Sequence, residues 1–348
     1  MTHRIGLKDV ARAAGVSIGT ASNAWARPGS VAEATRARVL AAAAELGFAG
    51  PAPGGRLLRT GRADCVGVVT DQPLAAFFTH AYTRRLMEGV AEACAARGAG
   101  IALVSGDGAG GWSIGSALVD GFVLYCLRDG SSLIERCAAR GLPMAGVDLA
   151  PHPAMATVRI DERAAAASVA RRVLAAGPRR VGVVSLHTGF DDPTTPLGRD
   201  TVDRVRYATT RARLEGYLDA LDAAGVEVEL VEAPGTAAGW DALTARWSGG
   251  AGAPDAVVAM SDEIAGELRA RLPSGTALAG FDGLEGAVAW PTLEQPVAEK
   301  GRLAVEAIYA PDGPRDRVLG TRLREPSPGA AAGGERAART TSPGPSRV

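Results

Sequence analysis

A run of small and polar residues between Ser17 and Trp25 fits the outer side of a single helix. The positions that we expect to face outward and contact a ligand are Ser17, Ile18, Gly19, Thr20, Ser22 and Asn23. An asparagine amide can form two hydrogen bonds to adenine, and an isoleucine can contact the methyl group of thymine. The hydroxyls of Thr20 and Ser22 suit phosphate oxygens, which fix the register of a protein on a duplex. The run therefore predicts a helix that reads DNA.

Three short helices would position this run. The segment 7–14 has its apolar residues on one face at the 3.6-residue period, and Gly15 can make the sharp turn that follows. Ser17 offers an N-cap for a second helix, which we expect to end near Trp25. The stretch 27–30 breaks the chain, and a third helix is predicted from about Ala32 to Leu46.

The first two helices have the features that hold a helix-turn-helix together. Ala11 is small where the helices would cross, and Gly15 forms the turn. The shared core is predicted to be Val10, Ala14, Val16, Ala21 and Ala24. Helix pairs with a glycine turn are common, so an ordinary helical pair is the alternative. The match at six spaced positions in a basic segment favours the DNA-binding motif, whose second helix enters the major groove.

Composition separates this head from the rest of the chain. The 348 residues are 47% apolar, which allows two or three compact domains, and Lys+Arg equals Asp+Glu at 38 each. The first 62 residues contain nine basic and three acidic residues, which indicates a segment that binds a polyanion. No apolar run is long enough to span a membrane, and the N-terminus lacks the apolar core of a signal peptide. We therefore expect a cytoplasmic protein with no membrane partner.

After a linker rich in Pro and Gly at 49–64, short β-branched runs alternate with amphipathic helices. The predicted strands are Cys65–Thr70, Gly100–Ser105, Gly121–Tyr125, Pro143–Val147, Arg180–Ser185, Val226–Val231, Ala256–Met260 and Thr276–Phe281. The predicted helices include Ala81–Arg97, Asp161–Ala176, Thr209–Ala224 and Asp262–Arg271. Such alternation predicts parallel sheets with helices on both faces.

The expected fold is thus a small all-α helix-turn-helix domain at 1–48 and an α/β core at 65–325. The length of the core suggests two doubly wound parallel-sheet lobes, with a break near residue 155 and the chain crossing back near 285. Residues 326–348 are Pro, Gly, Ala, Ser and Arg without periodicity, which predicts a disordered tail.

At this point the sequence resembles the LacI/GalR family of repressors. The N-terminal match is Leu7-Lys8-Asp9-Val10-Ala11, Ala14-Gly15-Val16-Ser17, Thr20-Ala21-Ser22-Asn23, Val31, Thr35-Arg36, Val39 and Ala44-Glu45-Leu46-Gly47-Phe48. Weaker blocks follow in the family's order: Gly141-Leu142-Pro143, Val147-Asp148, Val158, Asp161, Arg213-Leu214-Glu215-Gly216-Tyr217, Ser261-Asp262-Glu263, Gly280-Phe281-Asp282, Thr292 and Gln295-Pro296. The likeness runs to about residue 325.

The resemblance implies a homodimer or a larger assembly whose paired recognition helices bind a pseudo-palindromic operator on double-stranded DNA. It also implies a periplasmic-binding-protein-like core with a ligand cleft between the lobes. Arg36 is expected to contact phosphates. A hinge segment would insert Leu58, flanked by Arg56 and Arg59, into the minor groove. The chain departs from the family here, because the glycines of 50–55 disfavour a helix by about 1 kcal/mol each.

The cleft residues that the resemblance implies belong to aromatic, carboxylate, amide, hydroxyl and guanidinium types. They are Phe78, Tyr125, Asp148, Asp161, Arg213, Ser261, Asp282 and Gln295. Carboxylates and arginine can bind vicinal hydroxyls, and most of these residues follow predicted strands, where open α/β sheets bind ligands. Tyr125 and Ser261 differ from the types common at these positions. We expect a small polar effector such as a sugar or nucleoside, which modulates the operator affinity of a repressor.

Two other functions fit part of the sequence. The segment 106–111 matches G-x-G-x-x-G, which would suit a nucleotide-binding dehydrogenase, but a good helix does not follow it and a loop is the simpler interpretation. A plain sugar-binding protein would share the core but not the basic head. The four histidines and four cysteines show no catalytic or metal-binding spacing. We therefore expect no enzyme activity, no metal and no cofactor.

Overall fold

The computed structural model describes residues 5–50, 61–105, 113–189, 197–249, 252–287, 289 and 291–325. The chain divides into two compact units, Met1–Asp64 and Cys65–Val348, which are described separately below. The predicted hinge residues Arg56 and Leu58, the glycines of 106–111 and the tail 326–348 lie outside the described residues.

The first unit is a three-helix head with a small apolar core. Its helices are α1 (Leu7–Ala13), α2 (Ile18–Ala26) and α3 (Glu33–Glu45), with a 3-10 turn η1 (Pro28–Ser30) before α3. Gly15 turns the chain between α1 and α2 at a φ of 64°. This conformation is unfavourable for any residue that has a side chain, and glycine adopts it readily. The predicted helices are confirmed. The fully buried core residues are Val10, Ala11, Ala14, Ala21, Ala24, Val39, Ala42 and Ala43, with Val16 partly buried against them.

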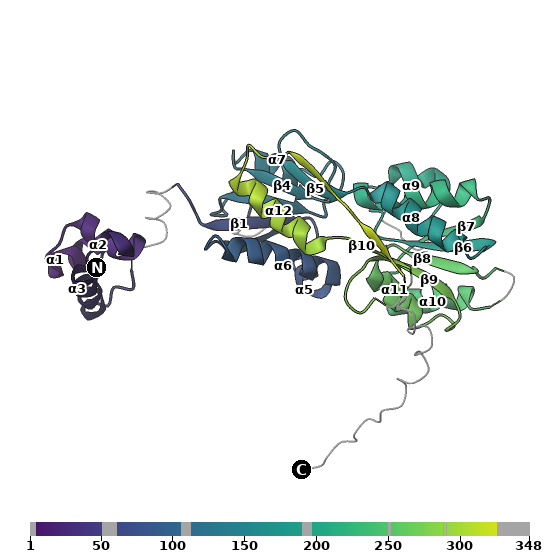
Figure 1. The fold of residues 1–348 in the computed structure, drawn as a ribbon, viewed down its shortest axis with the longest axis horizontal. Helices are drawn as coiled ribbons and strands as arrows, with labels where there is room; N and C mark the ends of the chain where they lie inside the picture. The colour runs from purple at the N-terminus through teal and green to yellow at the C-terminus, as the bar shows by residue number, and fades with distance from the viewer. Residues whose placement is uncertain are drawn as a thin grey trace, which may run out of the picture. The chain divides into compact units, whose positions relative to one another are not determined.

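The second unit contains two lobes, each built on a six-stranded sheet (Figure 1). The first sheet has the order β11-β5-β4-β3-β1-β2, and every pairing in it is parallel. Its strands are β1 (Cys65–Thr70), β2 (Gly100–Ser105), β3 (Gly121–Tyr125), β4 (Met144–Val147), β5 (Ala156–Ile160) and β11 (Asp316–Leu319). The helices of this lobe are α5 (Ala76–Thr79), α6 (Ala81–Ala95), α7 (Leu133–Ala138) and α12 (Val297–Tyr309).

Successive side chains of the strands in the first lobe point to opposite faces of its sheet, and both faces are apolar. Val66 and Val68 pack with Leu86 of α6 and Leu303 of α12, whereas Val69 belongs to a cluster on the other face. This arrangement follows from the two-residue period of a strand, which turns successive side chains to opposite faces. A doubly wound lobe results.

The second lobe repeats the plan with the strand order β12-β10-β9-β8-β6-β7. Its strands are β6 (Arg180–Ser185), β7 (Glu227–Glu232), β8 (Ala256–Ala259), β9 (Ala277–Asp282), β10 (Thr292–Glu294) and β12 (Arg322–Arg324). Its helices are α8 (Glu162–Leu174), η2 (Arg199–Arg204), α9 (Ala208–Ala223), α10 (Ala237–Trp247) and α11 (Asp262–Arg269). Only β12 is antiparallel to its neighbour among the pairings of the described strands.

Helix pairs in both lobes approach closely at glycines. A Cβ atom on Gly89 of α6 would lie 1.8 Å from the carbonyl oxygen of Ala298 in α12, and one on Gly216 of α9 would lie 2.1 Å from that of Arg163 in α8. No side chain fits at these distances, so these glycines permit the backbones of α6 and α12, and of α8 and α9, to touch.

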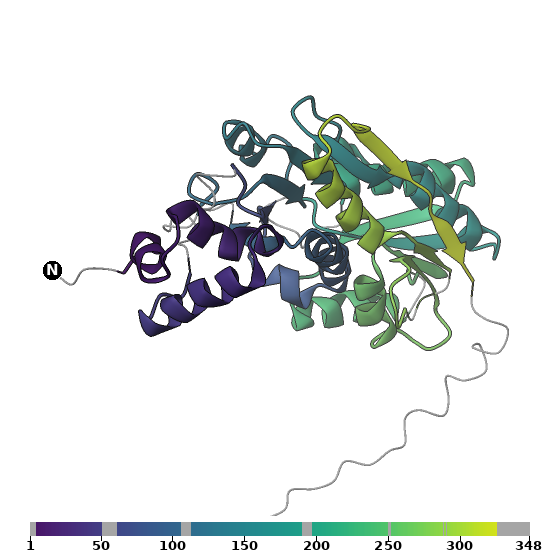
Figure 2. The ribbon, with the colours of Figure 1, turned by 60° about the vertical axis from the view of Figure 1, so that its left-hand side comes forward.

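The chain passes between the lobes three times. It leaves the first lobe after β5 at residue 160, returns between β10 and α12 near 295, and crosses once more from β11 to β12 near 320. The first two crossings thus come later than the expected 155 and 285, because β5 pairs with β4 and β10 pairs with β9 before the chain leaves each sheet. Figure 2 shows the last segment, in yellow, running from one lobe onto the other.

Candidate functional site

The outer face of α2 presents the residues that the sequence suggested for DNA contact. Ser17 caps the helix, because its Oγ accepts a hydrogen bond from Thr20 N at 2.9 Å and lies 2.8 Å from Thr20 Oγ1. Ile18 is 51% exposed, which is unusual for an isoleucine in a small domain. The side chains of Ser22 and Asn23 are half-buried and make no hydrogen bond to any described residue. The face is therefore open for recognition.

Two arginines of α3 brace the rest of the head. Arg36 Nε donates to the carbonyl oxygen of Ala24 at 3.3 Å, and Arg38 Nε donates to that of Ala14 at 3.0 Å. Both acceptors lie near the C-terminal ends of α1 and α2, where carbonyl groups lack partners within the helix. Arg36, expected only as a phosphate contact, thus also ties α3 to α2.

A cavity of about 180 Å³ lies in the second unit, and residues of both lobes line it. Half of its lining residues lie at the ends of strands β1, β3, β4, β6, β8 and β9 or just after them, as expected for parallel α/β sheets, and the others lie in or beside helices α5, α6, α9 and α11. The lining residues are Thr70, Gln72, Ala76, Phe77, His80, Tyr82, Thr83, Tyr125, Cys126, Leu127, Asp148, Leu149, Leu186, His187, Tyr207, Ala208, Thr209, Thr210, Arg213, Ser261, Glu263 and Asp282.

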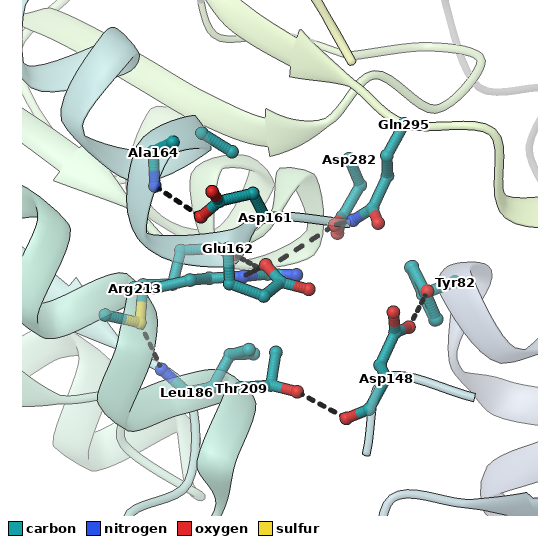
Figure 3. Close-up of polar contacts among 12 residues, drawn as sticks. Tyr82, Asp148, Asp161, Glu162, Ala164, Leu186, Thr209, Arg213, Asp282 and Gln295 are labelled. Atoms are coloured by element: carbon teal, nitrogen blue, oxygen red, sulfur yellow. Dashed lines mark hydrogen bonds and ion pairs between the residues drawn. The ribbon is translucent and has the colours of Figure 1, made fainter. Parts of the chain in front are cut away.

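Arg213 of α9 is the central cation of this cavity. Its Nε donates to Glu162 Oε2 at 2.7 Å, and its Nη1 donates to the carbonyl oxygen of Met260 at 2.7 Å and lies 3.7 Å from Asp282 Oδ1. The guanidinium also stacks on Phe281, with its central carbon 3.9 Å from the ring centroid. Figure 3 shows the side chain of Arg213 directed toward Glu162 and Asp282. These contacts fix the guanidinium in one orientation.

Asp282 ends β9 in a strained conformation. Its φ is 107°, a value that side chains disfavour, and non-glycine residues in such conformations concentrate at functional sites. Burial raises its pKa to about 8, although Arg213 opposes this shift. Gln295 Nε2 donates to Asp282 Oδ1 at 2.6 Å. Near neutral pH this side chain is therefore largely a neutral acid that can both donate and accept a hydrogen bond.

Asp148 is the corresponding carboxylate of the first lobe. It follows β4 at a φ of 53°, and its carboxylate accepts hydrogen bonds from Tyr82 of α6 and, at 2.6 Å, from Lys300 of α12. The ring of Tyr82 stacks on that of Tyr125, with centroids 5.9 Å apart. Figure 3 shows Tyr82 and Asp148 together, apart from the group around Arg213. The cavity thus has a hydrogen-bonded aspartate from each lobe, Asp148 from the first and Asp282 from the second.

Hydrogen bonds between the lobes border the cavity. Gln72 Nε2 donates to Tyr207 OH at 2.8 Å, and Thr209 Oγ1 donates to the carbonyl oxygen of Asp148 at 2.8 Å. Arg211 Nη1 pairs with Asp129 Oδ2 at 2.6 Å. Each of these pairs joins the second lobe to the first, so the lobes are closed on one another.

The structure gathers most of the expected cleft residues. Tyr125, Asp148, Arg213, Ser261 and Asp282 line the cavity, and Gln295 reaches it through Asp282. Ser261 Oγ, however, caps α11 by accepting a hydrogen bond from Ile264 N at 3.1 Å.

Two expected cleft residues lie elsewhere. Phe78 is 68% exposed and does not line the cavity, whereas its neighbour Phe77 does. Asp161 caps α8 through Ala164 N, and the next residue, Glu162, bonds Arg213. Successive helical residues point about 100° apart, so Phe77 and Phe78 of α5 face different surroundings.

Sequence reasoning also missed several polar groups that line the cavity or, like Lys300, bond a residue that lines it. Tyr82 and Lys300 lie within helices far along the chain from Asp148, where no local pattern marks them. His187 lines the wall, and its hydrogen bond to the buried Glu232 raises the pKa of this histidine. One signal was available for Lys300, because the chain has only two lysines among 38 basic residues.

The part of the chain that the structure describes shows neither a metal site nor a membrane-spanning helix. There, no group of three or more His, Cys, Asp and Glu side chains is arranged to hold a metal ion. Among the same residues, no helix combines the length and the apolar character needed to cross a lipid bilayer.

Comparison with known proteins gives a consistent result. Residues 6–50 match the model for bacterial regulatory proteins of the lacI family. An HTH-type transcriptional regulator of Mycobacterium tuberculosis is 33% identical over 319 residues, covering 85% of this chain and 88% of that protein. A similar regulator of Mycolicibacterium smegmatis is 32% identical, with coverage of 86% and 88%. These relatives are transcriptional regulators rather than enzymes.

Solved structures agree with this relationship. A LacI-family transcriptional regulator from Corynebacterium glutamicum superposes with a TM-score of 0.67 at 25% identity and covers 93% of this chain and 99% of its own. The regulator CelR, solved in complex with cellobiose, gives a TM-score of 0.58 at 27% identity, with coverage of 92% and 98%. The lac repressor dimer, solved on its operator, shares the fold, with a TM-score of 0.69 at 19% identity, and covers 92% of this chain and 98% of its own. The chain therefore belongs to the LacI family and is a DNA-binding transcriptional regulator.

Proposed function

We propose that this protein is a homodimeric repressor whose affinity for a pseudo-palindromic operator is changed by a small, uncharged polyol bound in the cavity between its lobes. The observation that carries the proposal is the charge arrangement of that cavity: each charged side chain that lines it already faces an opposite charge or is held neutral. Such a regulator acts in the cytoplasm, where its operator is.

The pairing of charges sets the chemical class of the effector. Arg213 faces Glu162, while His80 lies 3.4 Å from Glu263 and His187 lies 3.1 Å from Glu232. Asp148 is neutralised by Lys300, and the raised pKa of Asp282 keeps that side chain mostly protonated near neutral pH. An anionic effector that bound Arg213 or Lys300 would have to separate that cation from its buried partner, Glu162 or Asp148, which is costly. A neutral molecule with hydroxyl groups avoids this cost.

The size and walls of the cavity favour a single ring. A cavity of roughly 150 Å³ can hold benzene, and the present cavity of about 180 Å³ is only moderately larger. Its walls combine apolar surface from Phe77, Leu127 and Leu186 with the ring of Tyr125. Ligand pockets usually pair such surface with a few fixed polar groups. Here Arg213 and Asp282 supply those groups, and they are suited to two adjacent hydroxyls.

The head supplies the DNA-binding part. Its basic composition, the exposed Ile18 and the unengaged Asn23 support entry of α2 into the major groove. A dimer would present two such helices to the two halves of an inverted repeat. Arg56 and Leu58 remain proposed hinge contacts with the backbone and minor groove of the operator.

Selection of bound duplexes from random DNA tests the first half of the proposal. We expect an enriched inverted repeat, bound far more tightly than scrambled DNA at the same salt concentration. Binding without sequence preference, with only a steep salt dependence, would contradict it.

The effector is then sought by titrating the selected operator complex with neutral monosaccharides and cyclic polyols, and with their phosphorylated forms. We expect a neutral compound to change operator affinity and its phosphorylated form to have no effect. A response to the phosphorylated compounds alone would overturn the assignment of an uncharged effector. Deletion of residues 1–60 should abolish DNA binding while retaining binding of the neutral compound.

A further inference from the structure

Among the described residues of the second unit, the most buried cation does not line the cavity. Lys300 lies in α12, is completely buried and has three hydrogen-bond acceptors around its ammonium group. These are Asp148 Oδ1 at 2.6 Å, Tyr82 OH at 3.2 Å and Gln295 Oε1. An ammonium group has three protons, so every donor of Lys300 is used.

Gln295 continues this chain of hydrogen bonds into the second lobe. Its Oε1 accepts from Lys300, and its Nε2 donates to Asp282 Oδ1 at 2.6 Å. Asp148 of the first lobe and Asp282 of the second, which both line the cavity, are therefore joined through only two side chains. Both connecting side chains stand where the chain passes from β10 to α12, which is one of the three connections between the lobes.

Lys300 also fixes which atoms face Asp282. An ammonium group can only donate, so the oxygen of the Gln295 amide must face Lys300 and its NH₂ group must face Asp282. Asp282 Oδ1 is thereby engaged as an acceptor, and Oδ2 makes no hydrogen bond to any described residue. Reversal of the amide would place its NH₂ group against the ammonium group and remove the bond to Lys300.

The choice of lysine fits this arrangement. The chain uses arginine at nearly every basic position and has lysine only at 8 and 300. A guanidinium directs five donors within a plane, whereas an ammonium group is a compact charge with tetrahedral donors. Acceptors from β4, α6 and the segment before α12 surround a single point, which an ammonium group can satisfy.

We propose that Lys300 is a positioning residue that, through Gln295, couples the ligand-facing carboxyl groups of Asp148 and Asp282 across the connection between the lobes. A change at one of these groups, such as the arrival of an effector hydroxyl, is then transmitted to the other. The assignment of Asp148 and Asp282 to the effector rests on the proposed function, whereas their coupling can be measured without any effector.

The experiment is a double-mutant cycle on the full-length protein without ligand. The variants Asp148→Asn and Asp282→Asn are prepared singly and together, and their unfolding equilibria are measured in denaturant. We expect the double variant to lose less unfolding free energy than the two single variants lose in sum. The difference should correspond to about tenfold in the unfolding equilibrium constant, because breaking one end of this chain of hydrogen bonds lessens the cost of breaking the other.

The same cycle is then repeated in the backgrounds Lys300→Met and Gln295→Met. In both backgrounds we expect the effects of Asp148→Asn and Asp282→Asn on the unfolding free energy to become additive. The Gln295→Met background leaves the Lys300–Asp148 ion pair in place, so it tests the idea even if Lys300→Met does not fold. Asp148→Asn with Asp262→Asn is the matched control and should be additive, since Asp262 is buried in the second lobe but bonded to Thr292 and Leu284.

If the effects of Asp148→Asn and Asp282→Asn were additive in the protein that retains Lys300 and Gln295, the proposal would be overturned. So would coupling that persists in the Gln295→Met background, because the two carboxyl groups would then interact directly. Either result leaves the DNA selection and the effector titration unaffected, so failure of this inference is distinguishable from failure of the proposed function.

Discussion

Glu263 of the second lobe caps a helix of the first lobe through Ala81. The backbone N–H of Ala81, the first residue of α6, donates to Glu263 Oε1 at 2.6 Å. The N-cap of α6, His80, makes no capping bond with its own side chain and instead lies 3.4 Å from Glu263 Oε2. A carboxylate at a helix N-terminus is favourable for both hydrogen bonding and the helix dipole. This contact can form only while the lobes are closed.

Glu263→Ala is therefore expected to favour an open arrangement of the lobes. Loss of the cap should cost the closed state about 0.5–2 kcal/mol. Small-angle scattering of the ligand-free protein should show a larger radius of gyration. The control is Glu267→Ala on the same helix, whose side chain pairs only with Arg271 within the second lobe. Indistinguishable scattering from the two variants would rule out a capping contact that holds the lobes together.

Asp282 should make stability depend on pH in a defined direction. Its folded pKa of about 8 lies above the ordinary aspartate value of about 3.9, so the folded state holds the proton more tightly. The resulting stabilisation is complete below about pH 4 and is lost as the pH rises through about 8. The difference in unfolding free energy between the unaltered protein and Asp282→Asn should thus fall across this window and be constant above it. A difference that rises with pH would contradict the assignment.

The contact of α6 with α12 should not tolerate a methyl group. Gly89→Ala places a Cβ atom against the backbone of Ala298, so we expect a loss of about 1–3 kcal/mol or more, and a lower melting temperature. Gly266→Ala in α11 is the control, because its Cβ would meet nothing within 4 Å. That variant should be more stable by about 0.5–1 kcal/mol. Equal effects of the two substitutions would refute the close packing.

Substitutions in the head should separate base reading from general affinity. Asn23→Ala is expected to relax preference at one operator position by about 1–3 kcal/mol, measured by competition between operator variants at fixed salt. Arg36→Ala should weaken binding to all sequences alike, with an added loss of head stability from its bond to Ala24. A uniform loss of affinity from Asn23→Ala would show that this residue does not read a base.

The parts of the fold that follow from local pattern could be predicted from the sequence. The three helices of the head, the turn at Gly15 and the predicted β-branched strands all appear in the structure. The strands β5, β10, β11 and β12 were not predicted. They are three to five residues long, which is short for a clear pattern, and β12 is only Arg-Leu-Arg, a strand by virtue of its pairing with β10.

The site could be predicted at strand ends and, for Arg213 of α9, from the family resemblance. Asp148 and Asp282 directly follow or end buried strands, and family resemblance pointed to them. Tyr82 and Lys300 reach the same place from near the N-terminal ends of α6 and α12, and their direction depends on how these helices pack. Phe78 and Asp161 each stand one position away from a residue with a defined place near the cavity, Phe77 in its lining and Glu162 bonded to Arg213, because sequence alone does not fix the rotation of a helix about its axis.

The three passages of the chain between the lobes have a consequence for synthesis on the ribosome. Strands β6 to β10 and helices α8 to α11 of the second lobe come from the continuous stretch 162–294, whereas the first lobe needs α12 and β11 from 297–319 to complete its sheet and cover it. While the polypeptide is growing, the lobe that begins first must therefore wait with one face of its sheet partly uncovered. Nascent chains of this protein should be most vulnerable to proteases and most dependent on chaperones after residue 160 has emerged and before residue 319 has.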